Sequence, residues 1–194
     1  MNSTVYRLWL AVVALAFLAG PPAMGGDPVA EVSKIRKGGP DDWSAAVKTN
    51  VVARQAIAAA LMEIALDKSV NVEHRIDAVV LMAEIPSREV FDYLLRHLAL
   101  EFTNRDWVRD DDRLRDRPCR YALSRMDWSV VPYLLFFLEQ KRSDTELADL
   151  AYVLRKVMGS DTAIALLGAK QQKAASPLRE NLEKVVARLT ADKG

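Results

Sequence analysis

The chain is poor in the residue types that mark disulfide scaffolds, zinc sites and phosphate-binding loops. It has one cysteine, Cys119, and two histidines, His74 and His97, among 194 residues. One cysteine excludes an intramolecular disulfide, so an apolar core must hold the fold. We expect Cys119 to be a buried thiol, with a disulfide to another chain as the alternative. The histidines lack the His-x-x-x-His spacing of zinc ligands on a helix, and no glycine-rich loop follows a strand pattern, so no metal site and no cofactor are predicted.

An excess of charge of either sign is also missing. The chain has 27 basic and 26 acidic side chains, and its formal net charge is +1. Proteins that bind nucleic acid or an anionic membrane surface commonly carry a clear positive excess. The balance therefore predicts neither kind of partner.

The first residues have the order of a secretory signal peptide. Arg7 is followed by an apolar run from Leu8 to Ala19, which Gly20, Pro21 and Pro22 interrupt. Those twelve residues would rise about 18 Å as a helix, well short of the roughly 30 Å hydrocarbon core of a bilayer. Small residues at Ala23 and Gly25 suit cleavage before Gly26. We therefore expect residues 1–25 to be removed, with no membrane anchor left, and a periplasmic or extracellular domain over 27–194.

The mature part is predicted to be all-α and to form one domain. Glycine and proline fall between stretches that repeat apolar residues every three or four positions, and no stretch alternates as a half-buried strand would. A single long helix is expected from about 41 to 67, with Val51 and Val52 on its inner stripe. Asn71, Ser87 and Ser143 are predicted N-caps of later helices.

Apolar positions also recur about 40 residues apart. Ala78, Leu81, Met82 and Ile85 are matched by Cys119, Ala122, Leu123 and Met126, while Tyr93, Leu94, Leu95 and Leu98 are matched by Tyr133, Leu134, Leu135 and Leu138. Each unit would be an antiparallel pair of helices, and this spacing is typical of HEAT and armadillo arrays.

The residues from Arg75 to Ile85, followed by Val90 and Leu94, resemble the first and second helices of a HEAT repeat, and Arg120 to Leu123 with Val131 to Leu134 is similar. The resemblance covers about residues 71–174. It departs from the pattern at Pro118 and at Asp127-Trp128, and the third unit matches less well. The resemblance implies an α-α superhelix, or solenoid, whose second helices line a concave surface.

The segment 104–117 is rich in aspartate and arginine and contains Trp107. Its opposite charges cancel locally, which favours a lattice of ion pairs that ties the segment to neighbouring helices. A recognition loop anchored by Trp107 is one alternative, because Arg and Trp dominate binding hot spots. A calcium site is another, although the glycine turn and terminal glutamate of an EF-hand loop are missing.

The segment 130–138 is apolar on every side, so it is either covered all round or faces a partner. If the second helices line the concave surface, an aromatic and charged patch is expected there. The candidate binding residues are Arg88, Asp92, Tyr93, Arg96, His97, Trp107, Trp128, Tyr133, Phe136 and Phe137.

No catalytic constellation is recognisable, and the leading interpretation is a secreted, non-catalytic binding or scaffold module for a protein or peptide partner. One alternative is a homo-oligomer that self-associates through the helix 130–138. Another is a hydrolase that would use the aspartate cluster with His97, which needs a deep polar pocket.

Overall fold

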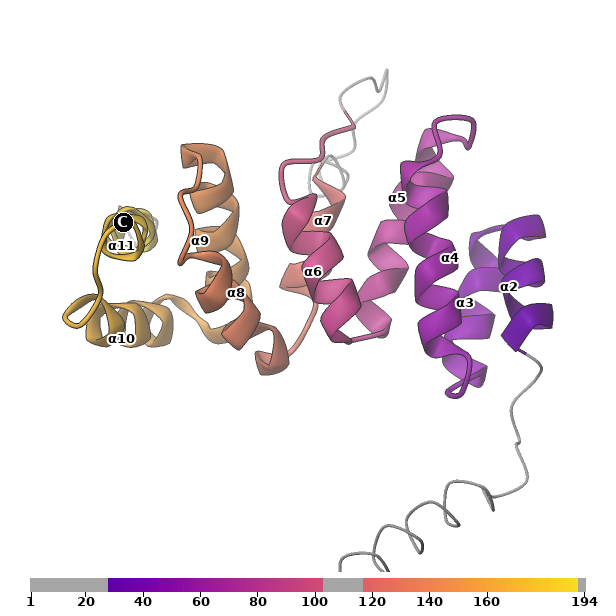
Figure 1. Ribbon diagram of the computed structural model, residues 1–194, viewed down its shortest axis with the longest axis horizontal. Helices are drawn as coiled ribbons and strands as arrows, with labels where there is room; N and C mark the ends of the chain where they lie inside the picture. Colours follow the sequence, from indigo (N-terminus) through magenta and orange to yellow (C-terminus); the bar gives the residue numbers. More distant parts are fainter. Residues whose placement is uncertain (1–27, 103–116, 192–194) are drawn as a thin grey trace, which may run out of the picture.

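The protein is built from helices that follow one another in a row. The computed structural model describes residues 28–102 and 117–191, and within these ranges it has ten α-helices, two short 3-10 helices and no strand. Figure 1 shows the helices succeeding each other along the long axis from α2 to α11. The signal peptide expected over 1–25, Trp107 and the rest of 103–116 lie outside the described residues. The all-α prediction is confirmed for the part that is described. The elements are α2 (Pro28–Lys37), α3 (Pro40–Thr49), α4 (Arg54–Leu66), α5 (Val72–Leu81), η1 (Met82–Glu84), α6 (Arg88–Arg96), α7 (Pro118–Ser124), η3 (Trp128–Val130), α8 (Val131–Phe137), α9 (Asp144–Met158), α10 (Ser160–Gln171) and α11 (Leu178–Ala191).

Short polar side chains begin the helices where the sequence predicts caps. The Oδ1 of Asn71 accepts a hydrogen bond from the N–H of Glu73 at 2.8 Å, and the Oγ of Ser87 accepts one from Val90 at 3.3 Å. Ser143 and Glu146 form a reciprocal capping box at the start of α9. These bonds satisfy amide groups that have no partner within their own helix.

The prediction of a single helix over 41–67 is wrong. The chain turns between Thr49 and Arg54, so that α3 and α4 contact each other and both contact α2 and α5. Val51 and Val52, expected on the inner stripe, are 66% and 67% exposed. The sequence Thr49-Asn50-Val51-Val52 has four successive residues of weak helix propensity, which makes this the natural place to interrupt the helix.

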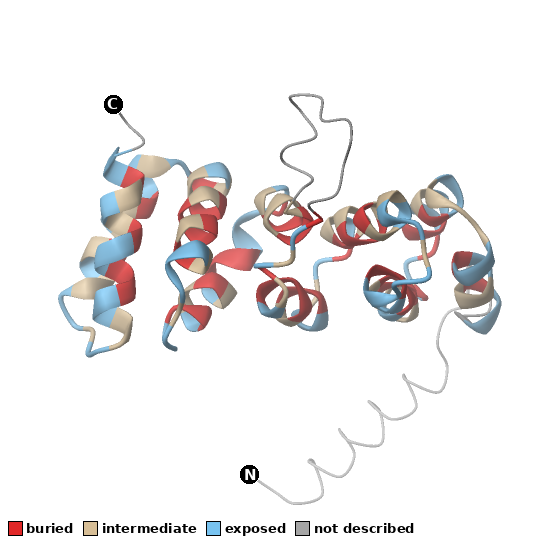
Figure 2. Ribbon diagram, turned by 90° about the horizontal axis from the view of Figure 1, so that it is seen from above, coloured by how far each residue is buried: buried red, intermediate tan, exposed pale blue. Residues whose placement is uncertain are grey.

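Alternate helices pack against one another in succession. Helix α3 contacts α5, α5 contacts α7, α7 contacts α9, and α9 contacts α11, while α6 contacts α7 and α8. The two helix pairs that the 40-residue spacing related therefore lie next to each other. One continuous apolar core runs from Ile35 in α2 to Leu189 in α11, and in Figure 2 the buried residues line the helix faces that meet. Cys119 belongs to this core, as a buried free thiol.

Candidate binding site between helices α6 and α8

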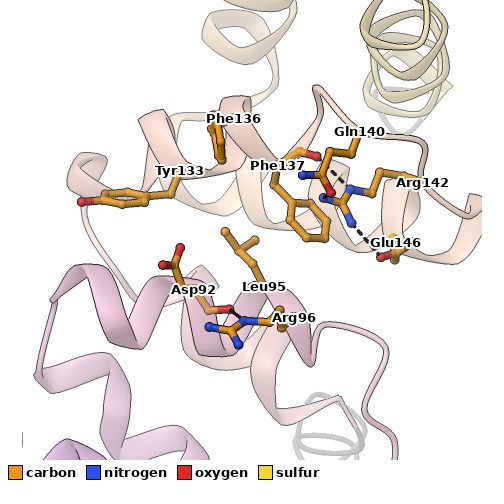
Figure 3. Close-up of a pocket in the computed structure, with 9 residues that line it drawn as sticks. All are labelled: Asp92, Leu95, Arg96, Tyr133, Phe136, Phe137, Gln140, Arg142 and Glu146. Carbon is orange, nitrogen blue, oxygen red and sulfur yellow. Dashed lines mark hydrogen bonds and ion pairs between the residues drawn. The ribbon is translucent and has the colours of Figure 1, made fainter.

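A pocket of about 370 Å³ lies between α6, α8 and the segment that leads into α9 (Figure 3). Its size falls in the range of small-ligand and side-chain pockets. Aromatic, apolar and charged side chains share its lining. The lining residues are Asp92, Leu95, Arg96, Tyr133, Phe136, Phe137, Gln140, Arg142 and Glu146.

Helix α6 supplies one wall. Asp92, Leu95 and Arg96 are spaced by three and four residues, which places them on one face of the helix. The Asp92 carboxylate lies 3.9 Å from the guanidinium of Arg88, and the Nε of Arg96 donates a hydrogen bond to the main-chain oxygen of Asp92 at 3.3 Å. Within residues 28–102 and 117–191, the Arg96 guanidinium has no carboxylate partner. Its positive charge is therefore available to a ligand.

Helix α8 supplies the aromatic wall. The ring of Tyr133 lies 4.4 Å from the ring of Phe91, which fixes its position against α6. Phe137 is buried and points toward Leu95, whereas Phe136 is 65% exposed at the pocket (Figure 3). An aromatic side chain this exposed leaves a large apolar area in contact with water. Covering that area would favour binding.

Arg142 closes the side of the pocket next to α9. Its guanidinium carbon lies 3.2 Å from the centre of the Phe137 ring, and its Nε donates to the Phe137 carbonyl at 2.8 Å. The same side chain donates to Gln140 at 3.1 Å and lies 3.6 Å from Glu146. Burial lowers the pKa of Arg142, and the charge of Glu146 opposes that effect. All of these contacts make Arg142 a fixed part of the pocket wall.

The C-terminal helix holds the connection that bears Gln140. The Asn181 side chain of α11 is 5% exposed, and its amide nitrogen donates to the main-chain oxygens of Leu138 and Gln140 at 2.8 and 2.7 Å. Lys184, one turn later, contacts Asp144 at 2.9 Å. Helix α11 thus fixes both ends of the segment 138–144.

Five of the ten predicted site residues line this pocket, namely Asp92, Arg96, Tyr133, Phe136 and Phe137. Arg88 lies beside it, through its contact with Asp92, and Trp128 is exposed on η3 outside the lining. Trp107 falls outside the described residues.

The expectation that Tyr93 faces outward is wrong, because its side chain is only 7% exposed. Its ring lies 4.6 Å from the ring of His97, and its buried hydroxyl has no hydrogen-bond partner. Burial raises the pKa of Tyr93, and burial together with the charge of Arg96 lowers the pKa of His97. Neither residue is part of the pocket lining: Tyr93 belongs to the apolar core, and His97 is partly buried.

Sequence reasoning missed Leu95, Gln140, Arg142 and Glu146. The Ser143-x-x-Glu146 capping box is readable from the sequence, and it would have placed Glu146 in the first turn of α9. Nothing in the sequence indicates that Arg142 lies on the ring of Phe137, because that contact depends on the path of the loop. Similarly, Asn181 meets Gln140 across 41 residues.

Only one residue of the arginine and aspartate segment 104–117 is described, Arg117. Its guanidinium binds the carboxylates of Asp149 in α9 and of Glu101. Arg120 contacts the same Asp149 at 3.2 Å. At this residue the structure therefore has the kind of ion-pair contact to a neighbouring helix that the lattice interpretation predicted.

The pocket offers groups for binding. Its lining contains two guanidinium groups, two carboxylates and three aromatic rings, and it contains no serine, threonine, cysteine or histidine. Within the described residues, no three or more His, Cys, Asp or Glu side chains come together in a way that could hold a metal ion. Among the helices of the same residues, none is long and apolar enough to span a bilayer.

Comparisons of the chain with protein-family models, with curated proteins and with solved structures found no match.

Proposed function

We propose that this chain is a non-catalytic binding module that receives a protein or peptide partner in the pocket between α6 and α8. The observation that supports this most directly is that the guanidinium of Arg96, which has no carboxylate partner among residues 28–102 and 117–191, shares a pocket with the exposed ring of Phe136. Arginine and aromatic side chains contribute most to binding hot spots, because each buries a large area and offers directional contacts. Rigid walls, made by Tyr133 and Arg142, would reduce the entropy lost on binding.

The frame for this site would be a short HEAT-like solenoid. Support comes from the 40-residue spacing of apolar positions and from the packing of α5 on α7 and of α6 on α8. In such an array the second helices of successive repeats lie side by side and form an extended concave surface. Helices α6 and α8 would be those second helices, so the pocket would lie on that surface.

The module would work outside the cytoplasm, after removal of residues 1–25. This proposal rests on the sequence order of one basic residue, a short apolar run and small residues before Gly26. Mass spectrometry of the protein purified from its native envelope or medium tests this proposal. A mature N-terminus at Gly26 is expected, and a chain that retains residues 1–25 would contradict it.

Site-specific photo-crosslinking tests the binding function. A photoreactive phenylalanine analogue replaces Phe136, and a matched variant carries the same analogue at Trp128, which is also exposed but lies outside the pocket lining. After irradiation in the native extracellular fraction, position 136 should form a defined adduct that position 128 does not form. Equal adducts at both positions, or none at 136, would count against the pocket.

Self-association is a second candidate, favoured by the exposure of Trp128 and Phe136 on neighbouring elements. Val131, Leu134, Phe137 and Leu138 are already buried within one chain, so these two aromatic side chains would form most of a seam through 130–138. Sedimentation analysis separates the candidates. A monomer at micromolar concentration would exclude the stable homo-oligomer.

A further inference from the structure

We propose that the partner is a peptide segment in which an Asp or Glu side chain binds Arg96 while a neighbouring large apolar side chain covers Phe136 and Tyr133. This inference rests on the proposed function and names the chemistry of its partner. It follows from the charges of the pocket, the geometry of Arg96 and the position of the aromatic wall.

The charges of the pocket leave one group uncompensated. Arg142 lies 3.6 Å from Glu146, and Glu146 also accepts hydrogen bonds from the N–H and hydroxyl of Ser143, both at 2.8 Å. Asp92 lies 3.9 Å from Arg88. Arg96 has no such partner among the described residues, so an incoming anion would meet a net positive group. Complementary charge selects partners more effectively than it adds affinity.

The geometry of Arg96 suits a carboxylate. Its Nε is held by the main-chain oxygen of Asp92, which fixes the side chain and leaves both terminal nitrogens for a ligand. Two parallel N–H groups of a guanidinium match the two oxygens of a carboxylate, and such paired bonds are stronger than neutral ones.

The carboxylate is better assigned to a side chain than to a peptide C-terminus. Sites that capture a terminal carboxylate commonly use a cluster of free main-chain N–H groups. Asp92, Leu95 and Arg96 lie within α6 after its first turn, where the amides are engaged in the helix. At Arg96 the available donors are therefore those of the side chain, and a partner can pass through the pocket in extended form with Phe136 beside the acidic residue.

The test is selection from a library of heptapeptides with acetylated N-termini and amidated C-termini, presented to the full mature chain. The expected result is enrichment of peptides with Asp or Glu next to a large apolar residue. Arg96→Gln should weaken the binding of selected peptides about tenfold or more, because it removes a charged pair of hydrogen bonds. Arg125→Gln is the matched control, since Arg125 is also an exposed arginine at a helix end but lies outside the pocket lining, and its change should have little effect.

Each outcome separates this inference from the proposed function. Enrichment of apolar residues without acidic ones, or equal binding by the Arg96→Gln variant, would overturn the inference alone. Acidic enrichment that appears only with a second library of free C-termini would also overturn it, in favour of terminal recognition. A complete lack of selected peptides would overturn both. Urea unfolding of each variant verifies that the folded state is retained.

Discussion

Asn181 links the C-terminal helix to the candidate site, and replacing it tests how that link works. Its amide group donates to two main-chain oxygens, those of Leu138 and Gln140, at the end of α8. The Asn181→Asp change keeps the shape of the side chain and replaces the donor with an acceptor. The new carboxylate would then face two carbonyl oxygens in a buried position.

The expected loss of stability is large for a change of one atom. Each hydrogen bond contributes about 0.5–1.5 kcal/mol, and a buried acceptor left without a donor costs about 1–3 kcal/mol. We expect a decrease of roughly 3 kcal/mol in the free energy of unfolding at pH 7. The position is in the first turn of α11, where a negative charge normally favours the helix, so the helix itself would oppose this loss.

Equilibrium urea unfolding, followed by circular dichroism, measures the effect. A shift of the midpoint reports a change in stability when the slope of the free energy against urea concentration is unchanged. Asn71→Asp is the matched control, because Asn71 caps α5 and aspartate is an equally good cap. The control should change the free energy of unfolding by less than about 0.5 kcal/mol. An Asn181→Asp variant as stable as the control would refute the view that α11 holds the end of α8 through this side chain.

Two further changes test the electrostatic contacts that surround the core. Asp149→Asn should lower the free energy of unfolding by about 3 kcal/mol, because it leaves the guanidinium groups of Arg117 and Arg120 without their shared, buried carboxylate. Urea unfolding measures this loss of stability. An unchanged free energy of unfolding would contradict the prediction and would mean that the arginines find other partners. The pKa of Asp144 lies below its ordinary value of 3.8, mainly because Lys184 donates a hydrogen bond to it. Its contribution to stability is therefore complete above pH 3.8 and is lost as the pH falls through the folded-state pKa. Asp144→Asn should reduce the acid sensitivity of the urea midpoint below pH 3.8, and an unchanged pH profile would contradict this assignment.

The local signals in the sequence are strong for helix starts. Asn71, Ser87 and Ser143 are short polar residues ahead of apolar periodicity, and each one caps a helix as predicted. Helix interruptions without glycine or proline are harder to foresee. The helix propensities of the residues that follow Thr49 are only modestly unfavourable, so they do not by themselves require a break. The break depends on tertiary packing, in which α5 contacts both α3 and α4.

The candidate site was predictable in part, for reasons that individual residues make clear. Asp92 and Arg96 lie on one face of α6, and Leu95 is the one large apolar residue on that face. The sequence therefore indicates that the core does not need this face, which can form a pocket wall. Tyr93 was placed outward because of the resemblance to second helices of HEAT repeats. It lies three residues after Val90, which is fully buried, so helical periodicity favours the core for Tyr93 as well.

Long-range contacts account for what the sequence does not indicate. The segment 138–144 is held from α11, by Asn181 at one end and by Lys184 through Asp144 at the other. A chain ended near residue 174, where the resemblance stops, would lose both of these contacts together with the cover over α9 and α10. Gln140 and Arg142 would then lack the support that positions them in the pocket. The last helix is therefore part of the proposed binding site although it contributes no residue to the lining, because it fixes the loop on which one wall depends.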